Sequence, residues 1–251
     1  IAYISASLIY KKTITMIFEV FIKLLLAHII GDFFLQSDDF CKRKLKNGVK
    51  SPELYLHSLI IFTLSWIALF SWNAWGIAII AGASHLIIDT IKCLIKKDNL
   101  YSFAADQLLH CLVIFAIAFV CSTKWISYIT LHESFFVNQI IVITIAFLFC
   151  AKPANILTKY ILKLYNINNP SDNNSSTKLH SGALIGTLER WLIIVFVLLG
   201  HFEAIGFLLA AKSLIRFKDS ETLKTEYVLL GTLISVTIAV ACSLITKVSI
   251  V

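Results

Sequence analysis

The stretch LLLAHIIGDFFLQSDD, residues 24–39, places ionisable side chains inside an apolar run. The run belongs to a segment over 17–40, close to the length of about 20 residues that a helix needs to cross a bilayer. His28, Asp32 and Gln36 are spaced by four, so a helix would put them on one face. Ionisable side chains are rare and costly inside a membrane, and this face is therefore a candidate functional site.

The composition of the whole chain fits a membrane protein. Hydrophobic residues make up 58% and charged residues 15% of the 251 residues, against about 45–50% and about 25% in soluble domains. Such a chain cannot cover a soluble surface with polar groups, which excludes a cytosolic enzyme, a secreted disulfide module and a disordered chain. The net charge of +7 does not indicate nucleic-acid binding, because the basic residues fall mostly in short connections between apolar segments.

Eight apolar segments approach the length of a membrane-spanning helix. They cover residues 17–40, 53–73, 74–96, 102–122, 136–165, 180–200, 202–217 and 224–248. The fifth contains Lys152 and Pro153, where we expect the helix to kink or end, and the seventh is short. We therefore predict an all-α fold, a polytopic transmembrane bundle of seven or eight helices.

The chain is predicted to form one integral membrane domain after its first residues. Residues 1–15 precede Met16, the single methionine, and two interpretations stay open: a stretch that is not native, or a genuine N-terminal extension. The six cysteines form no CxxC pair, and we interpret them as reduced packing residues. The predicted parts of the domain 16–251 are a front bundle at about 17–166, a polar linker at 167–178 and rear helices at 179–248.

The basic residues predict the orientation of the chain. They gather in four connections, around residues 42–50, 92–97, 152–178 and 212–224. An eight-helix topology puts all four on one side of the membrane, and lysine-rich and arginine-rich connections lie in the cytoplasm. We therefore expect a multi-pass protein of a bacterial inner membrane, with both termini outside the cytoplasm.

Three further segments repeat the polar pattern of the first. ELYLHS at 53–58 carries His57, ASHLIIDTIK at 83–92 carries His85 and Asp89, and AADQLLHC at 104–111 carries Asp106 and His110. In the predicted topology all these side chains fall in the cytoplasmic half of the membrane. Imidazole and carboxylate groups suit zinc, manganese or iron, and helix bundles build such sites from pairs spaced by three or four residues. The predicted ligands of one or two divalent ions are His28, Asp32, His57, His85, Asp89, Asp106 and His110.

The remaining polar residues around this set receive supporting roles. Asp32 or Asp106 is the candidate general base, and Gln36, Lys92 and Gln107 would orient ligands or substrate. Two other interpretations of the set stay open: a pathway for protons or ions, and a purely structural network of hydrogen bonds and ion pairs.

The rear part has a second polar set, made of Glu189, Arg190, Lys212, Arg216 and Glu226. One interpretation is a pocket for an anion such as a phosphate head group. The other is a set of ion pairs between helices. The residues leave both open.

Several of these strings, taken in order, resemble the DUF3307 family of bacterial membrane proteins of unknown function. In the front part they are AHIIGDFFLQSDDF, YLHS, ASHLIIDTIK and FAADQLLH, and in the rear part IGTLERWLI, AAKSLIRF and TEYVLLGTLIS. The resemblance covers roughly 17–248 and implies no established activity. The arrangement is also loosely similar to membrane-bound metal-dependent hydrolases, which place histidine and aspartate on transmembrane helices.

The leading functional hypothesis is a metal-dependent membrane hydrolase. It would act from the cytoplasmic leaflet on a lipid or a lipid-linked phosphate or ester, with Lys212 and Arg216 holding the anionic head group. Its partners would be membrane lipids and such a substrate. The alternatives are a proton- or cation-coupled transporter or channel, and a structural or sensor protein. The apolar outer halves of the first four segments argue against a path through the membrane.

Overall fold

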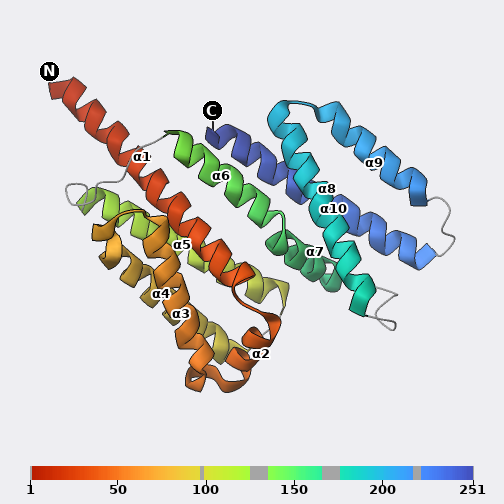
Figure 1. The fold of residues 1–251 in the computed structure, drawn as a ribbon, viewed down its shortest axis with the longest axis horizontal. Coiled ribbons are helices and arrows are strands. Elements are labelled where there is room, and N and C mark those ends of the chain that lie inside the picture. Colours follow the sequence, from red (N-terminus) through yellow and green to blue (C-terminus); the bar gives the residue numbers. More distant parts are fainter. Residues whose placement is uncertain (1, 97–98, 125–134, 166–175, 217–221, 251) are drawn as a thin grey trace. The chain divides into compact units, whose positions relative to one another are not determined.

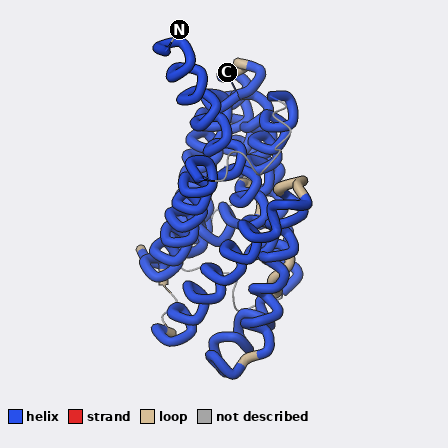
Figure 2. Tube along the Cα trace, turned by 90° about the vertical axis from the view of Figure 1, so that its left-hand side faces the viewer, coloured by secondary structure: helices blue, strands red, loops and turns tan. Residues whose placement is uncertain are grey.

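Helices make up nearly all of the backbone in the computed structural model (Figures 1 and 2), which describes residues 2–96, 99–124, 135–165, 176–216 and 222–250. The α-helices are α1 (Ala2–Ile29), α2 (Asp38–Asn47), α3 (Pro52–Ala68), α4 (Trp75–Ile95), α5 (Leu100–Lys124), α6 (Phe135–Phe149), α7 (Lys152–Leu164), α8 (Ser176–Leu199), α9 (Phe202–Arg216) and α10 (Thr222–Ile250). Short turns complete the described part: the π-helical turn η1 (Ile30–Phe34) and the 3₁₀ turns η2 (Gly48–Lys50) and η3 (Trp72–Ala74). The predicted all-α class is therefore confirmed.

Six helical stretches are long and apolar enough to cross a membrane, among the residues that the structure describes. They are Lys12–Phe34, Trp72–Ile95, Leu100–Ser122, Phe136–Leu164, Gly182–Leu199 and Tyr227–Ile250. The chain is thus a multi-pass membrane protein. Large apolar side chains such as Trp72, Leu94 and Phe207 are exposed, as lipid-facing side chains are.

The expected count of seven or eight spans is confirmed only in part. The second expected span is α3, which is apolar but has 17 residues. The seventh is α9, whose 15 residues extend about 22 Å at about 1.5 Å per residue. That is well below the roughly 30 Å of a hydrocarbon core.

The first expected helix, 17–40, is wrong beyond Phe34, and its last turn before that point is not α-helical. A π-helical turn follows α1, closed by the hydrogen bond from Leu35 N to Ile30 O. The separate helix α2 then begins, because the Ser37 hydroxyl accepts a hydrogen bond from Phe40 N and caps its start. Its polar sequence could not continue a membrane span. Gln36 therefore lies in the connection and not on the helical face of His28.

The chain divides into two compact units, Ile1–Ile141 and Val142–Val251, here called the front unit and the rear unit. In the front unit α1, α3, α4 and α5 pack on one another. The core includes Val20 and Leu24 of α1, Ile77 of α4 and Ala118 of α5. In the rear unit α8 packs on α7, α9 and α10. The polar linker expected at 167–178 falls mostly outside the described residues.

The break expected near Pro153 is confirmed in the rear unit. Helix α6 ends at Phe149, and Pro153 sits in the first turn of α7, where its missing N–H breaks no hydrogen bond. Cys150 and Ala151 form the corner between the two helices. Ala151 O accepts a long hydrogen bond from Asn155 N at 3.4 Å. The Cys150 carbonyl lies where the helical ladder is interrupted and needs a donor from elsewhere.

Close approach of α3 and α4 depends on Gly82. A Cβ atom at this position would lie 3.0 Å from Phe62 Cβ and 3.2 Å from Ser58 O. The Ser58 hydroxyl also donates a hydrogen bond to Gly82 O at 2.8 Å, which holds the two backbones together. We expect Gly82→Ala to destabilise the protein by about 1–3 kcal/mol through overpacking.

The matched control for Gly82→Ala is Gly206→Ala, because a Cβ atom at Gly206 meets nothing within 4 Å. Alanine in an open helical position is neutral or stabilising, by up to about 1 kcal/mol. Thermal melting of the detergent-purified variants measures both effects. A Gly82→Ala protein that melts at the wild-type temperature would contradict the close packing of α3 on α4.

Candidate metal centre

All seven predicted ligands come together inside the front unit. They lie at the level where α1 ends and α5 begins. None of the seven side chains is more than 9% exposed. The seven side chains that were predicted to share one depth are therefore buried close to one another, and their depth in the membrane stays a prediction. The contributors are His28 of α1, Asp32 of η1, His57 of α3, His85 and Asp89 of α4, and Asp106 and His110 of α5.

Asp32 joins three of these elements through one oxygen. Its Oδ1 accepts hydrogen bonds from His57 Nε2 at 3.1 Å and from His85 Nε2 at 2.9 Å. His28 Nδ1 lies 3.6 Å from the same oxygen. The π-helical turn delivers this carboxylate, and π turns inside or after α-helices are frequent at functional sites.

Three histidines share a hydrogen-bonding pattern that matters for metal binding. His28 Nε2 donates to the Gln107 side-chain oxygen at 3.3 Å, His85 Nε2 to Asp32, and His110 Nδ1 to the backbone oxygen of Asp106 at 2.9 Å. Each acceptor oxygen requires a donating N–H. The second nitrogen of each ring, Nδ1 of His28, Nδ1 of His85 and Nε2 of His110, is buried without a hydrogen-bond partner.

The distances within this trio suit a single ion. One ligand atom from each of His28, His85 and His110 lies within 4.8 Å of the other two. The ring centroids of His85 and His110 are 4.2 Å apart, and those of His28 and His110 are 4.8 Å apart. Nitrogens around a tetrahedral zinc ion lie about 3.3 Å from one another, since each bond is about 2.0–2.1 Å. Small side-chain rotations would close the trio on a metal.

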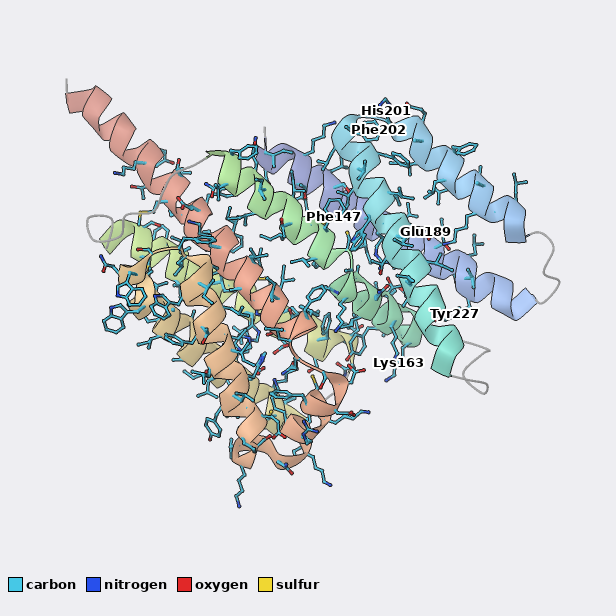
Figure 3. The ribbon with its side chains drawn as sticks, in the orientation of Figure 1. Phe147, Lys163, Glu189, His201, Phe202 and Tyr227 are labelled. Carbon is cyan, nitrogen blue, oxygen red and sulfur yellow. The ribbon has the colours of Figure 1, made fainter. Side chains whose placement is uncertain are left out.

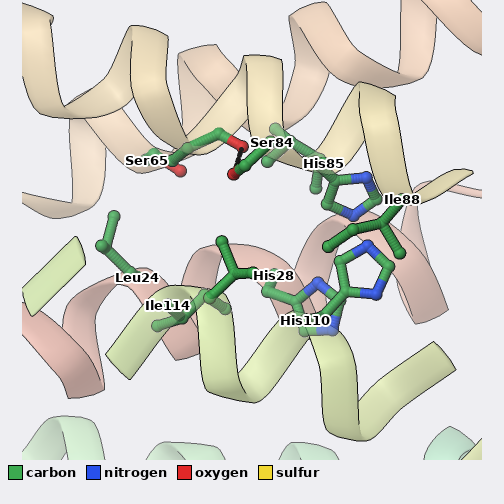
Figure 4. A pocket seen from close by; sticks show the side chains of 11 residues that line it. Leu24, His28, Ser65, Ser84, His85, Ile88, His110 and Ile114 are labelled. Carbon is green, nitrogen blue, oxygen red and sulfur yellow. Dashed lines mark hydrogen bonds between the residues drawn. The ribbon is translucent and has the colours of Figure 1, made fainter. Parts of the chain in front are cut away.

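A small cavity borders the same three rings (Figure 4). Its volume is about 20 Å³, and His28, His85 and His110 line one end of it. Ser65 and Leu24 lie at the other end. A water molecule needs at least about 10–15 Å³. The cavity therefore has room for one water molecule and none for a lipid substrate.

Asp89 and Asp106 carry lysine partners. Lys44 Nζ lies 2.5 Å from Asp89 Oδ2, and Lys92 Nζ lies 2.6 Å from Asp106 Oδ2. With His110, the two carboxylates form a further group whose ligand atoms lie within 4.8 Å of one another. In the sequence, Lys44 is one of the basic residues of the connection around 42–50. The α2 helix that buries it was not expected.

The predicted supporting residues have different surroundings. Gln107 touches both sides of the centre: its oxygen accepts from His28, and its amide donates to Asp106 Oδ2 at 3.1 Å. Lys92 holds Asp106. Gln36, by contrast, keeps a buried Nε2 without a hydrogen-bond partner. The regular spacing of His28, Asp32 and Gln36 thus indicated the first two correctly but not the third.

A buried ion pair lies outside the predicted set, on α1. Glu19 and Lys23 are 0% and 3% exposed and bond to each other. Glu19 Oε2 has no hydrogen-bond partner, and Lys23 Nζ lies 5.9 Å from the centre of the Phe70 ring. The expectation that the outer half of the first helix is apolar is therefore wrong. The spacing by four could have indicated the pair.

In the rear unit, Arg190 is buried and bonds to neutral oxygens. It donates to Cys150 O at 2.5 Å, to Asn155 Oδ1 at 2.6 Å and to Ser235 Oγ at 2.7 Å. A longer bond reaches Ala151 O at 3.4 Å. Among the described side chains, no carboxylate is within ion-pair distance of Arg190. The guanidinium thus satisfies the carbonyls at the corner between α6 and α7.

The other members of the rear set are described only in part. Glu189 of α8 (Figure 3) forms an ion pair with Lys212 of α9, which matches the interpretation as a pair between helices. The side chains of Arg216 and Glu226 lie outside the described residues. The front and rear sets fall in different units. Binding of a substrate by Glu189, Arg190, Lys212, Arg216 or Glu226 stays a prediction.

Comparison with known proteins finds a family match for the front unit. A family model described as a protein of unknown function (DUF3307) matches residues 20–142. The matched stretch contains all seven predicted ligands and the lysines Lys44 and Lys92. The strings of the rear unit lie outside it. No curated protein and no solved structure matches the chain.

The contacts of Arg190 generate a prediction that separates an anion pocket from a structural role. Arg190→Lys keeps the positive charge but loses the planar fork that reaches several oxygens. We expect this variant, like Arg190→Met, to lower the stability by about 1–3 kcal/mol for each buried oxygen left without a donor. Thermal melting measures the loss, with Lys159→Met on the exposed face of α7 as the control. Full stability of Arg190→Lys would mean that charge alone matters.

Proposed function

Because residues 20–142 belong to the DUF3307 family, whose function is unknown, we propose a function from the centre itself: the front unit binds a divalent transition metal ion. The ligands are the unpartnered nitrogens of His28, His85 and His110. One observation carries the proposal. Each of these buried rings donates one N–H to an oxygen and leaves the other nitrogen without a hydrogen bond, with carboxylate oxygens 3.6 Å from His28 Nδ1 and 3.8 Å from His85 Nδ1.

This pattern is the one that metal-binding histidines have. Such a histidine donates its second N–H to a carboxylate, a carbonyl or water, which fixes the ring and its tautomer. Here the acceptors are Gln107, Asp32 and the backbone oxygen of Asp106. A purely structural network would pair the free nitrogens, since each unsatisfied buried group costs about 1–3 kcal/mol. A metal ion accounts for all three at once.

We further propose that the ion serves hydrolysis of a lipid or lipid-linked phosphate or ester. Catalytic zinc sites often have three protein ligands and one open position, and a bound divalent ion would activate water and polarise the substrate. The carboxyl group best suited as general base is Asp106, because its Oδ1 is unpartnered while Lys92 and Gln107 hold Oδ2. Asp32 is already engaged by two histidines. The Lys92 side chain is 31% exposed and marks the accessible edge of the centre.

The side of the membrane from which substrate would arrive is inferred from the basic residues near the centre. The accessible edge of the centre lies beside α2, which carries Lys42, Arg43 and Lys46, and beside Lys96 at the end of α4. Since basic ends of membrane helices face the cytoplasm, we propose that substrate arrives from the cytoplasmic leaflet of a bacterial inner membrane. The N-terminal end of α1 would then lie on the opposite side.

A second candidate function is a pathway for protons or cations. The buried pair Glu19–Lys23 favours it, because it extends the polar groups of α1 toward the other membrane face. The one-water cavity lies on that side of the histidines, bordered by Leu24 and Ser65. Intramembrane chains of ionisable groups mark ion routes in other proteins.

Metal content tests the proposed site directly. We expect the detergent-purified protein to hold one equivalent of zinc, manganese or iron by elemental mass spectrometry, and His28→Ala, His85→Ala and His110→Ala to lose it. Gln107→Ala removes only a supporting acceptor and should weaken binding by about 10–100-fold.

The control for the histidine variants is His201→Ala, because the His201 side chain is exposed and bonds only to Glu203 among the described residues. This variant should retain the metal. Metal that is absent from the wild type after reconstitution, or retained in all three histidine variants, would refute the site.

Two variants separate hydrolysis from transport. Asp106→Asn should retain the metal and lose about 10²–10⁴-fold of hydrolysis, measured on a panel of phospholipids and lipid-linked phosphates, because it removes a general base. Glu19→Gln should leave that hydrolysis intact. If instead the protein moves protons or zinc into liposomes and Glu19→Gln stops this flux, the pathway is the correct function.

A further inference from the structure

A second group of potential ligands shares His110 with the histidine trio and adds two carboxylates. One ligand atom each from Asp89, Asp106 and His110 lies within 4.8 Å of the others. Since His110 Nε2 serves the first ion, the second group offers its two carboxylates, and Asp106 Oδ1 is buried without a hydrogen-bond partner. Two buried carboxylates at this distance repel each other strongly unless cations neutralise them.

Two lysines supply that neutralisation. Lys44 reaches Asp89 from α2, and its side chain is 5% exposed. Lys92 reaches Asp106 from the last turn of α4. Buried lysine is unusual, and its ammonium group is a compact cation of the kind that carboxylate oxygens bind. Each ammonium group therefore holds a carboxylate oxygen, Asp89 Oδ2 or Asp106 Oδ2, that a divalent ion could otherwise bind.

The charges of the centre support this substitution. Its acidic groups are Asp32, Asp89 and Asp106, and its permanent cations are Lys44 and Lys92. Two ammonium groups carry the same charge as one divalent ion. The net charge is therefore the same in two cases. In the first, one divalent ion lies on the histidine trio and both lysines are present. In the second, two divalent ions are bound and both lysines are absent. Adding a second divalent ion while both lysines remain would bury two further positive charges, which is costly in a low dielectric.

We infer that Asp89 and Asp106 form a second divalent-cation position that Lys44 and Lys92 fill in the native protein, so that the centre holds one metal ion and not two. The inference rests on the proposed metal site for the meaning of the first ion. Lys44 and Lys92 then limit the centre to one metal ion. Asp89 and Asp106 can bind a second ion when these ammonium groups are removed.

The test is the zinc stoichiometry of the full chain with both lysines removed. Wild type and Lys44→Met/Lys92→Met are loaded with Zn²⁺ in detergent, dialysed and measured by elemental mass spectrometry. We expect one equivalent in the wild type and two in the double variant. Lys42→Met/Lys46→Met is the matched control, because both lysines are exposed on α2, and it should hold one.

The outcomes separate this inference from the proposed function. One equivalent in both wild type and double variant would refute the second position and leave the histidine site intact. No zinc in the wild type but one equivalent in the double variant would refute the histidine site and support the second position. Two equivalents in the wild type would show that the lysines exclude nothing, and no zinc in either protein would refute both.

Loss of folding in the double variant is controlled by a charge-balanced change. Lys44→Met/Asp89→Asn removes an ammonium group together with its carboxylate, so the buried centre keeps its net charge. This variant should hold one equivalent and should melt at the same temperature with and without a second equivalent of Zn²⁺. The lysine double variant should instead be destabilised without zinc and regain stability on loading. Two equivalents in the charge-balanced variant would contradict the role of Asp89.

Discussion

The hydrocarbon core of a membrane offers no water to a polar group, and both units of this protein are organised by that constraint. Each buried donor, acceptor or charge needs a partner within the protein, and the cost of failure is several kcal/mol. The front unit meets the requirement with a cluster around Asp32 that draws η1, α3 and α4 together. The rear unit meets it with one guanidinium at a helix corner. In both cases a polar side chain determines which helices can be neighbours.

The two units satisfy the constraint to different extents. Arg190 bonds to oxygens on α8, on α10 and at the corner of α6 and α7, and it leaves a packed, closed structure. Gly186 leaves the space for it, since a Cβ atom there would lie 3.2 Å from Arg190 Nη1. The front cluster keeps unpaired nitrogens on His28, His85 and His110. Buried polar atoms without partners are costly, and a ligand is one way to satisfy them, whereas the contacts of Arg190 need none.

Sequence patterns predicted the parts of the centre that depend on one helix. Pairs such as His85 and Asp89 share a helical face by spacing alone, and the lengths of the apolar segments place them at one depth. Contacts between helices were not predictable in this way. Lys44 lies 45 residues from Asp89, on a helix whose polar sequence looks like an ordinary connection. The free nitrogen of each histidine likewise depends on acceptors from other elements, and a local pattern carries no information on them.

The π-helical turn that delivers Asp32 restricts the length of the chain as well as its composition. An α-helix advances by about 100° per residue, and the turn at Ile30–Phe34 contains one residue more than an α turn would. Deleting a single residue there can restore α geometry and leave the following segment almost in phase, because the wider turn is what accommodates the extra residue. The side chains inside the turn, Asp32 among them, would then point in a different direction. The number of residues between His28 and Ser37 therefore helps to aim this carboxylate, even where the residues themselves are replaceable.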